Sequence, residues 1–456
     1  MVVLSKFGND LFFHAIRMHR NFPAMKKTIE ILGVTVCLLL LFSGSSFLCS
    51  ISYGQGIFLR ASGAVNESMG GATTAAPIDA QGCLQWNPAG ISMLERNEVD
   101  MGMGLVIPSC EFGSSATNLQ TGKVESHVTR GEPGAVAVPS MGFIYHKPNS
   151  NVTYGLGMSA FAGAKLAYPY LGEDHQMLTS VMKDSRGMDL NCLNSDIYLL
   201  QIAPTVSWKL SENLSFGAAP TITMAQVLCD PLFVSQMPDG YITPTSPVGI
   251  SSRYAWGAGF QLGVYYKTNC DWAFGFCYKS QNWMEPLRYH TKEMLPDETE
   301  VGGVRKLHLN VPDVMTFGIA YSGFDKTLIA LDLRRFGYAD SGGDYLRMGW
   351  KNLFGLNLGV QRIINERWTM RAGYAYNDCP YSSEYTLANS ATPMITQHVV
   401  FLGSTVKMTE NIEMTLAYSH AFDNKVSRTL MTEPIYLSAS SEIGADTLTM
   451  GLRFLF

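Results

Sequence analysis

The residues of this chain that could do chemistry do not combine into a catalytic or cofactor-binding pattern. The segment Gly155-Leu-Gly-Met-Ser-Ala160 fits the G-x-G-x-x-[GA] pattern of dinucleotide-binding loops, but such a loop must lead into a helix whose N-terminus holds the phosphates. An alternating strand pattern runs through this segment, so we reject a dinucleotide site. His398 and His420 could serve a serine–histidine lipase, yet the chain has no G-x-S-x-G motif. We therefore expect no catalytic residue, no cofactor and no enzyme.

The cysteines indicate neither a metal site nor a disulfide framework. Nine are present, and because Cys37 and Cys49 precede residue 55, seven lie in the rest of the chain. That number is odd, the spacing is wide, and no C-x-x-C pair occurs, unlike in zinc sites or disulfide-rich domains. The chain also lacks H-E-x-x-H. We expect no metal, and a bridge between two loop cysteines stays open.

The composition excludes a nucleic-acid-binding protein and suits strands in a membrane. Charged residues make up 16% of the 456 residues, below the roughly 25% of soluble domains. Glycine (43 residues), tyrosine (21) and phenylalanine (23) are plentiful, as strands and aromatic girdles require. The formal net charge is -5 and no cluster of Lys and Arg occurs. We therefore expect no nucleic-acid partner.

One long apolar run lies near the N-terminus and has the form of a secretory signal. Met25-Lys-Lys27 is followed by an apolar stretch over residues 29–42 and by small residues over 43–52. A core of about 12 apolar residues is too short for a spanning helix, which needs roughly 20. Ser52-Tyr-Gly54 offers a small-x-small cleavage site. We predict that residues 1–54 are an N-terminal extension and signal peptide that is removed, with the start at Met1 or Met25.

The last ten residues alternate between large apolar and small or polar side chains. A period of two over about ten residues indicates a tilted strand with one face in lipid and the other toward a polar interior. On this segment alone, the edge strand of a soluble sandwich stays open. The apolar residues are Leu448, Met450, Leu452, Phe454 and Phe456, and Thr447, Thr449, Gly451 and Arg453 lie between them.

The same alternation recurs upstream, and short and long connections alternate between the strands. Short polar turns on one side and long loops on the other are typical of outer-membrane barrels. We predict an all-β fold, a 14-stranded antiparallel transmembrane β-barrel over residues 98–456. The six short turns are 147–151, 209–213, 267–271, 322–326, 364–367 and 407–411, and the seven long connections are 109–137, 164–195, 227–251, 284–306, 339–350, 379–395 and 425–441.

Residues 55–97 do not alternate. They are rich in small residues and carry short helical hints. A compact segment ahead of a barrel could fill its lumen, and we predict that residues 55–97 form a hatch that plugs it. A disordered periplasmic tail is the alternative, which Phe58, Leu84 and Trp86 make less favourable because they are strongly apolar.

A set of short motifs follows in order along the chain after residue 54. Ser68-Met-Gly-Gly-Ala72, Asp79 and Trp86-Asn-Pro-Ala-Gly-Ile91 come first, and Pro312-Asp313 and the terminal Phe456 come late. Together with the fourteen predicted strands, this set resembles the FadL/TodX family of outer-membrane transporters for long-chain fatty acids and aromatic hydrocarbons. The resemblance covers essentially the whole mature chain, with residues 109–310 matching by layout rather than by motif.

The resemblance implies passive uptake of a hydrophobic compound through a hatch-gated barrel with a lateral exit into the membrane. The ligand would be a long-chain fatty acid or another hydrophobic small molecule, bound near the hatch N-terminus by Ile57, Phe58 and Leu59. The other expected partners are outer-membrane lipid and lipopolysaccharide, and the barrel-assembly machinery, which would engage Phe456. We expect a monomer in the bacterial outer membrane. A general porin, whose lumen would be open, and an outer-membrane lipase are the alternatives.

The gate implied by the resemblance is a kink in the third strand, residues 153–163, beside the hatch residues Asn87, Pro88 and Ala89. Asn87 could offer its amide to ladder groups that a bulge leaves unpaired, and Pro88 would stiffen that corner of the hatch. A plain turn is the alternative for this corner. The glycines expected at the kink are Gly155, Gly157 and Gly163, which suit a bulge or simply pack against the hatch.

Overall fold

The structure, a computed structural model, describes residues 55–168, 193–230, 234–236, 242–244, 250–294, 300–341, 348–432 and 435–456. The predicted leader, residues 1–54, lies outside this part of the chain, as does most of the long connection predicted over 164–195. No helix among the described residues is long and apolar enough to cross a membrane.

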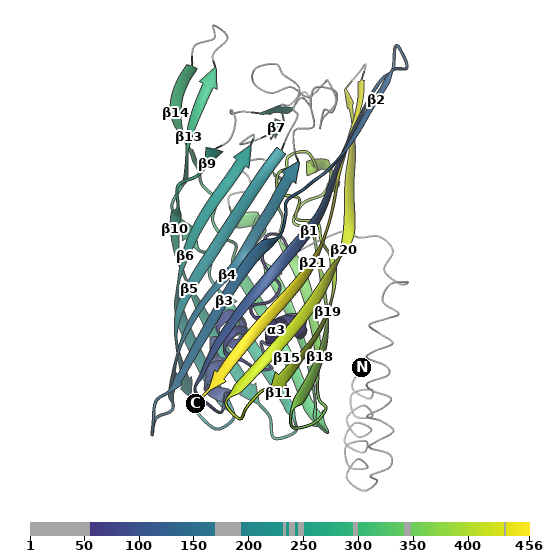
Figure 1. Ribbon diagram of the computed structural model, residues 1–456. Helices are drawn as coiled ribbons and strands as arrows, with labels where there is room; N and C mark the ends of the chain where they lie inside the picture. The colour runs from purple at the N-terminus through teal and green to yellow at the C-terminus, as the bar shows by residue number, and fades with distance from the viewer. Residues whose placement is uncertain are drawn as a thin grey trace, which may run out of the picture. The chain divides into compact units, whose positions relative to one another are not determined.

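Fourteen of the described strands form one closed antiparallel barrel (Figure 1). Each pairs with the next in chain order, and β21 pairs with β1 to close the ring. The predicted fold class is therefore confirmed. The barrel strands are β1 (Glu98–Asn118), β3 (Val136–His146), β4 (Val152–Tyr168), β5 (Leu193–Lys209), β6 (Leu214–Asp230), β10 (Ala255–Lys267), β11 (Trp272–Lys279), β15 (Val314–Phe324), β16 (Thr327–Phe336), β17 (Leu353–Ile363), β18 (Trp368–Asn377), β19 (His398–Lys407), β20 (Ile412–Thr432) and β21 (Ile435–Leu455).

The six short turns predicted from the sequence lie between consecutive barrel strands, at the end of the barrel that carries the C-terminus (Figure 1). Three predicted long loops are instead largely strand, and one of them, over 284–306, is mostly the hairpin of β13 (Leu287–Met294) and β14 (Glu300–Leu307). The connection over 109–137 contains the upper part of β1 and its hairpin partner β2 (Val124–Arg130), and the one over 425–441 is the paired end of β20 and β21. The outward faces of the extensions of β1, β20 and β21 are mostly polar, so these extensions lack the apolar lipid-facing side that marks the other strands. Their inward faces carry buried apolar residues such as Phe112 and Leu437.

The opposite end of the barrel also carries short strands and two 3-10 helices. The hairpin of β13 and β14 and the hairpin arm of β2 project there (Figure 1). These elements are β7 (Val234–Gln236), β8 (Ile242–Pro244), β9 (Ile250–Ser251), β12 (Trp283–Met284), β13 (Leu287–Met294), β14 (Glu300–Leu307), η2 (Tyr338–Asp340) and η3 (Ser383–Tyr385).

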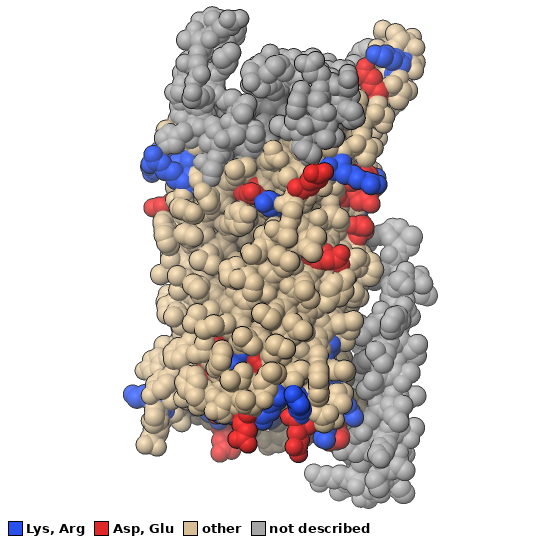
Figure 2. All heavy atoms as spheres, viewed as in Figure 1, with Lys and Arg blue, Asp and Glu red and all other residues tan. Residues whose placement is uncertain are grey.

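The outer surface follows the predicted alternation. In β21, Leu448 and Met450 are about half exposed, whereas Thr449 between them is buried inside the barrel. The face shown in Figure 2 has a broad band almost free of charged side chains, with charged residues gathered above and below it. Such a band suits the hydrocarbon layer of a bilayer.

Residues 55–97 pack against the inner wall of the barrel. They form α3 (Ala64–Ser68), α4 (Ala80–Trp86) and η1 (Pro88–Met93), and nearly all of their side chains are buried. This close packing is possible because small residues lie both in residues 55–97, as predicted, and on the barrel strands that face them. A Cβ added to Gly217 would meet the backbone of Pro88 and Ala89, and one added to Gly275 would meet the carbonyl of Thr74. We call residues 55–97 the hatch.

Candidate functional site

The ladder between β3 and β4 is incomplete. The two strands pair from His146↔Thr153 up to Ser140↔Ser159 and no further, although β3 continues to pair with β1. Beyond residue 159, β4 contains a bulge between Ala160 and Ala162 and its pairing changes. Higher up, the connection that precedes β3 meets β4, where the amide of Glu132 donates to the carbonyl of Ala167 at 2.7 Å. We call this interval, 136–139 on one side and 160–166 on the other, the window.

The start of the hatch pairs with the bulged part of β4. The amide of Leu59 donates to the carbonyl of Phe161, and the amide of Gly163 donates to the carbonyl of Ile57, each at 2.9 Å. Phe58 and Ala162 form the bridge between these bonds. The hatch therefore supplies the backbone partners that β3 does not, which satisfies groups that would otherwise be buried without hydrogen bonds.

An apolar cavity of about 380 Å³ lies behind the window. Its lining comes from both edges of the window, from β1 and β5, and from the hatch residues Ile57 and Leu59. Thr392, Pro393 and Met394 complete it from the connection after β18. Residues of the wall include Val106, Val138, Ala160, Ala162, Ile197 and Leu199. The cavity can therefore hold an apolar molecule directly beside a gap in the barrel wall.

A second apolar cavity, of about 70 Å³, lies on the other side of Ile57. It is lined by β5, β6, β12 and the base of the β13–β14 hairpin, with Trp350 and Val311 among its residues. The two apolar cavities share Ile57, Ile197, Leu199 and Thr392. Ile57 thus lies between the loop end of the barrel and the cavity behind the window.

A third cavity, of about 140 Å³, has a mixed lining that is more polar than the linings of the two apolar cavities, and we call it the polar cavity. It shares Leu59, Val106, Val138, Ala160, Thr396 and Ala445 with the large apolar cavity. Its remaining wall carries the hatch residues Arg60 and Glu67 and several hydroxyl groups from the strands. Ser419 donates to Glu67 at 2.8 Å, and Thr449 donates to its other carboxyl oxygen. Burial raises the pKa of Glu67, and these two hydrogen bonds oppose the rise.

The three residues predicted to bind ligand lie together at these cavities. Ile57 and Leu59 line the apolar cavity behind the window, and Phe58 lines the polar one. Phe58 is buried and packs against Phe161, with ring centroids 5.8 Å apart, and against two aromatic rings of the β16 region, Phe336 at 5.1 Å and Tyr338 at 6.2 Å. The structure thus brings the predicted trio to one place, and its role in binding stays a prediction.

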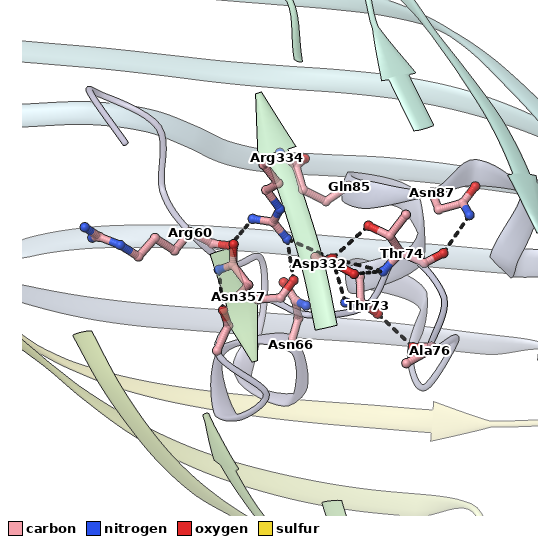
Figure 3. Close-up of polar contacts among 12 residues, drawn as sticks. Arg60, Asn66, Thr73, Thr74, Ala76, Gln85, Asn87, Asp332, Arg334 and Asn357 are labelled. Atoms are coloured by element: carbon pink, nitrogen blue, oxygen red, sulfur yellow. Dashed lines mark hydrogen bonds and ion pairs between the residues drawn. The ribbon is translucent and has the colours of Figure 1, made fainter. Parts of the chain in front are cut away.

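On the opposite wall, Asp332 and Arg334 of β16 hold the hatch (Figure 3). The Asp332 carboxylate accepts hydrogen bonds from the amides of Thr73 and Thr74 and, at 2.7 Å, from the Thr74 hydroxyl. Arg334 lies 3.3 Å from Asp332 and donates to the carbonyls of Gly71 and, at 3.0 Å, of Arg60. Both side chains are fully buried. We call this pair and its hatch partners the anchor.

Trp86, the last residue of α4, is stacked by two cations. The guanidinium carbon of Arg334 lies 3.4 Å from the centroid of the Trp86 ring, and Nζ of Lys279 lies 5.3 Å from it. Cations over an indole face are attracted by its electron-rich ring. This contact joins the anchor to the end of α4, directly before Asn87.

Asn87, Pro88 and Ala89 do not lie beside the window. The Asn87 amide donates to the carbonyl of Thr74 at 2.7 Å and to that of Val264, in β10, at 3.0 Å, and its oxygen accepts from the amide of Ala89. The prediction that the Asn87 amide serves the kinked strand is therefore wrong, because its hydrogen bonds go to the hatch and to β10. η1 packs mainly against β5, β6 and β10 and reaches β4 through Ile91, which lies against Gly155. The gating role assigned to these three residues stays a prediction.

The bulge between Ala160 and Ala162 lies within the predicted segment 153–163 but not at Gly155 or Gly157. Gly155 and Gly157 are in regular ladder with β3, and a Cβ on either would meet Leu84 of the hatch, at 2.7 Å and 3.1 Å. These two glycines make room for α4, which was the alternative left open. Gly163 lies just past the bulge and bonds to Ile57. The residue that interrupts the ladder is Phe161, whose ring points into the hydrophobic core with Phe58.

Asp79 and Asp100 join the hatch to the barrel near the short-turn end. The Asp79 side chain caps α4 by accepting from the amide of Gly82 at 3.3 Å. The side chains of Asp100 of β1 and Arg453 of β21 lie close to Asp79. Arg453 pairs with Glu413 and, at 3.8 Å, with Glu98. Burial raises the pKa of Asp79, and Arg453 opposes the rise.

The two histidines considered for catalysis have ordinary strand neighbours. Nδ1 of His398 lies 2.6 Å from the Tyr374 hydroxyl, and Nδ1 of His420 lies 2.9 Å from a carboxyl oxygen of Asp446. Within the described part of the chain, no group of His, Cys, Asp and Glu could hold a metal ion.

The site residues predicted from the sequence do not include Asp332 and Arg334, and they also do not include Arg60, Phe161 and Tyr338. The available signal was weak: a charged pair at positions i and i+2 places both side chains on the inner face of one strand. Their hatch partners lie about 260 residues away in the chain, and no local pattern reveals such a contact.

The chain matches the family described as "Outer membrane protein transport protein (OMPP1/FadL/TodX)" over residues 46–456. It is 23% identical over 321 residues to Outer membrane protein P1 of Haemophilus influenzae, covering 64% of this chain and 67% of that one. It is 22% identical over 351 residues to the Long-chain fatty acid transport protein of Shigella flexneri, covering 67% and 74%.

Two solved structures have the same fold. The toluene transporter TodX of Pseudomonas putida gives a TM-score of 0.66 at 15% identity, over 87% of this chain and 99% of that one. A FadL homologue of Pseudomonas aeruginosa gives 0.64 at 13% identity, over 88% and 99%.

Proposed function

This chain belongs to the outer membrane protein transport family (OMPP1/FadL/TodX), and from that premise we propose that it gives passive uptake of long-chain fatty acids or aromatic hydrocarbons through a hatch-gated barrel with a lateral exit. It is an outer-membrane transporter of hydrophobic compounds and not an enzyme. The finer parts of the proposal are the substrate, the gate and the exit. They rest on the cavities and on the window.

The single observation that carries the proposal is the apolar cavity behind the window. Each buried methylene of a ligand contributes about 0.8 kcal/mol to its transfer from water. The hydrocarbon layer outside the window offers a similar gain, so a ligand can leave sideways without first returning to water. An exit along the barrel axis toward the periplasm would require that return.

The entrance is the loop end of the barrel. The smaller apolar cavity lies there, and Ile57 separates it from the larger one. A shift of the first hatch residues would therefore join the two cavities into one apolar path. Ile57 is held by the Tyr338 hydroxyl, which accepts from its amide at 2.9 Å. The first hatch residues act as the inner gate in this proposal.

The remaining partners belong to the same proposal. Phe456, which is exposed and ends the closing strand, would be engaged by the barrel-assembly machinery. Outer-membrane lipid and lipopolysaccharide would surround the apolar band as partners of a monomer.

The test deletes the bulged residue. Phe161 is the extra residue of β4 relative to β5, so deleting it restores regular pairing with β5 and lets β4 run straight on beside β3. We expect closure of the window and at least a tenfold loss of uptake of a fluorescent fatty acid and of an aromatic hydrocarbon, with heat-modifiable mobility unchanged. The matched control, Phe161→Ala, keeps the extra residue and should keep most of the uptake. Full uptake by the deletion variant would refute the lateral exit.

A general porin is the competing function, and deleting residues 55–97 separates the two. If the hatch plugs the lumen, its deletion raises the ion conductance of the barrel sharply in planar bilayers. Unchanged conductance would favour a lumen that is already open.

A further inference from the structure

Arg60 is a cation without a carboxylate partner among the described residues. The other arginines that hold the hatch have one: Arg334 lies 3.3 Å from Asp332, and Arg453 pairs with Glu413 and Glu98. The Nη2 atom of Arg60 donates to the carbonyl and hydroxyl oxygens of Thr396, at 3.0 and 3.3 Å. Its Nε atom is buried and makes no hydrogen bond within the described part of the chain.

The position of Arg60, where two cavities adjoin, is a second observation beside its lack of a carboxylate partner. Its side chain lines the polar cavity, which shares six residues with the apolar cavity behind the window. Glu67, the acidic residue on the same polar cavity, accepts hydrogen bonds from Ser419 and Thr449 instead. A cation with unused donors therefore lies in a hydroxyl-lined chamber that adjoins a large apolar one. That arrangement matches a molecule with a small anionic head and a long apolar tail.

The geometry of Arg60 is fixed in advance. Its carbonyl accepts from Nη1 of Arg334, so its backbone is attached to the anchor, and Thr396 orients its guanidinium. Burial lowers the pKa of Arg60 to about 10, so the side chain keeps its charge at neutral pH. A guanidinium held in this way presents planar donors that suit a carboxylate.

We propose that Arg60 binds the ionised head of an amphiphilic ligand whose hydrocarbon tail occupies the apolar cavity, and that this contact makes long-chain carboxylates the preferred substrates over plain hydrocarbons and neutral lipids. The inference rests on the proposed function and names the substrate class within it. A plain hydrocarbon would fill the apolar cavity but leave the partly buried guanidinium without a counter-charge, and withdrawing such a charge from water is costly. A long-chain carboxylate would place its hydrocarbon tail in the apolar cavity and its charged head against Arg60.

Lys165 offers a matched comparison. It also lines the apolar cavity, from β4, but Asp196 lies 3.9 Å from its ammonium nitrogen. Its charge is therefore already compensated within the protein. If charge alone near the cavity selected carboxylates, Lys165 would contribute as much as Arg60. If an uncompensated charge is required, only Arg60 contributes.

The experiment measures binding of hexadecanoate and of hexadecanol, its neutral counterpart, to the mature protein in lipid nanodiscs at pH 8. The wild type should bind hexadecanoate at least tenfold more tightly than hexadecanol, since hydrogen bonds to charged groups are among the stronger ones. Arg60→Gln should bring that ratio close to one while leaving hexadecanol binding within twofold. Arg60→Lys should keep an intermediate ratio, and Lys165→Gln should keep the wild-type ratio.

Three results would overturn the inference. Equal wild-type affinities, an unchanged ratio in Arg60→Gln, or a ratio lost in Lys165→Gln would each remove Arg60 as the selective residue while leaving the transporter intact. Failure of the wild type to bind either ligand would instead refute the apolar cavity as a ligand site. Arg60→Lys keeps the test decisive if Arg60→Gln does not fold, because it retains the charge with a different shape.

Discussion

Replacing Asp332 with Asn should release the hatch without unfolding the barrel. The substitution keeps the size of the side chain but removes the charge that faces Arg334, and an amide nitrogen then faces the donors of Thr73 and Thr74. Removing one partner of a buried ion pair costs about 3–5 kcal/mol. Since about 1.4 kcal/mol is a factor of ten in an equilibrium constant, the hatch should open roughly 150- to 4,000-fold more often.

The assay is channel recording in planar bilayers under increasing urea. We expect Asp332→Asn to pass ion current at a lower urea concentration than the wild type, while both keep the heat-modifiable mobility of a folded barrel. The double variant Asp332→Asn/Arg334→Gln should recover part of the loss, because it no longer leaves a buried charge uncompensated. A wild-type urea profile for the single variant, or simple additivity in the double variant, would refute the anchor.

Two further predictions concern the hatch. Asn87→Ala and Pro88→Ala should leave the amount of protein in the membrane near normal and lower uptake of a hydrophobic substrate several-fold. The reason is that the corner of the hatch that Asn87 ties to Thr74 and Val264 would lose its shape. Wild-type uptake by both variants, at equal expression, would remove the gating assignment. Burial raises the pKa of Asp79, so its contribution to hatch stability is present at low pH and is lost as the pH rises through the raised value. The urea needed to open the channel should therefore fall with increasing pH in the wild type and vary less in Asp79→Asn, and a pH-independent wild type would contradict this reasoning.

The fold could be predicted because lipid and lumen impose a strict period on every barrel strand. Leu448 and Met450 face outward and Thr449 inward, as their alternation required, and the six short turns marked the strand ends. Above the membrane that constraint disappears. The upper parts of β1, β20 and β21 were therefore predicted as loops, since their outward faces are polar and their apolar residues, such as Phe112 and Leu437, face inward.

The site was predicted less completely because its decisive contacts join distant parts of the chain. Ile57, Phe58 and Leu59 came from a family resemblance, and the structure places them at the cavities. The bulge at Phe161 exists where the hatch replaces β3 as the partner of β4, so it depends on a tertiary pairing and not on the glycines nearby. Asn87 was assigned to the wrong strand for the same reason: a turn motif predicts local shape but not which wall it contacts.

The hatch is held more strongly on the β16 side than on the window side, and this difference in strength indicates which part of the hatch can move. On the β16 side, a buried ion pair and several charge-assisted hydrogen bonds hold residues 70–74. On the window side, residues 57–59 are held by two backbone hydrogen bonds, by the bond from the Ile57 amide to the Tyr338 hydroxyl, and by the packing of Phe58, all between uncharged groups. Because hydrogen bonds to charged groups exceed neutral ones in strength, the first hatch residues should detach before the anchor does.

This order of detachment couples the binding of the ligand to its release in the proposed transport cycle. The residues held most weakly include Ile57, which separates the two apolar cavities, and they precede Arg60, the proposed head-group ligand. A carboxylate bound to Arg60 would compete for the guanidinium with Thr396 of the wall. Binding would therefore loosen the same segment whose movement joins the cavities, and the anchored remainder of the hatch would keep the lumen closed to ions while the ligand leaves through the window.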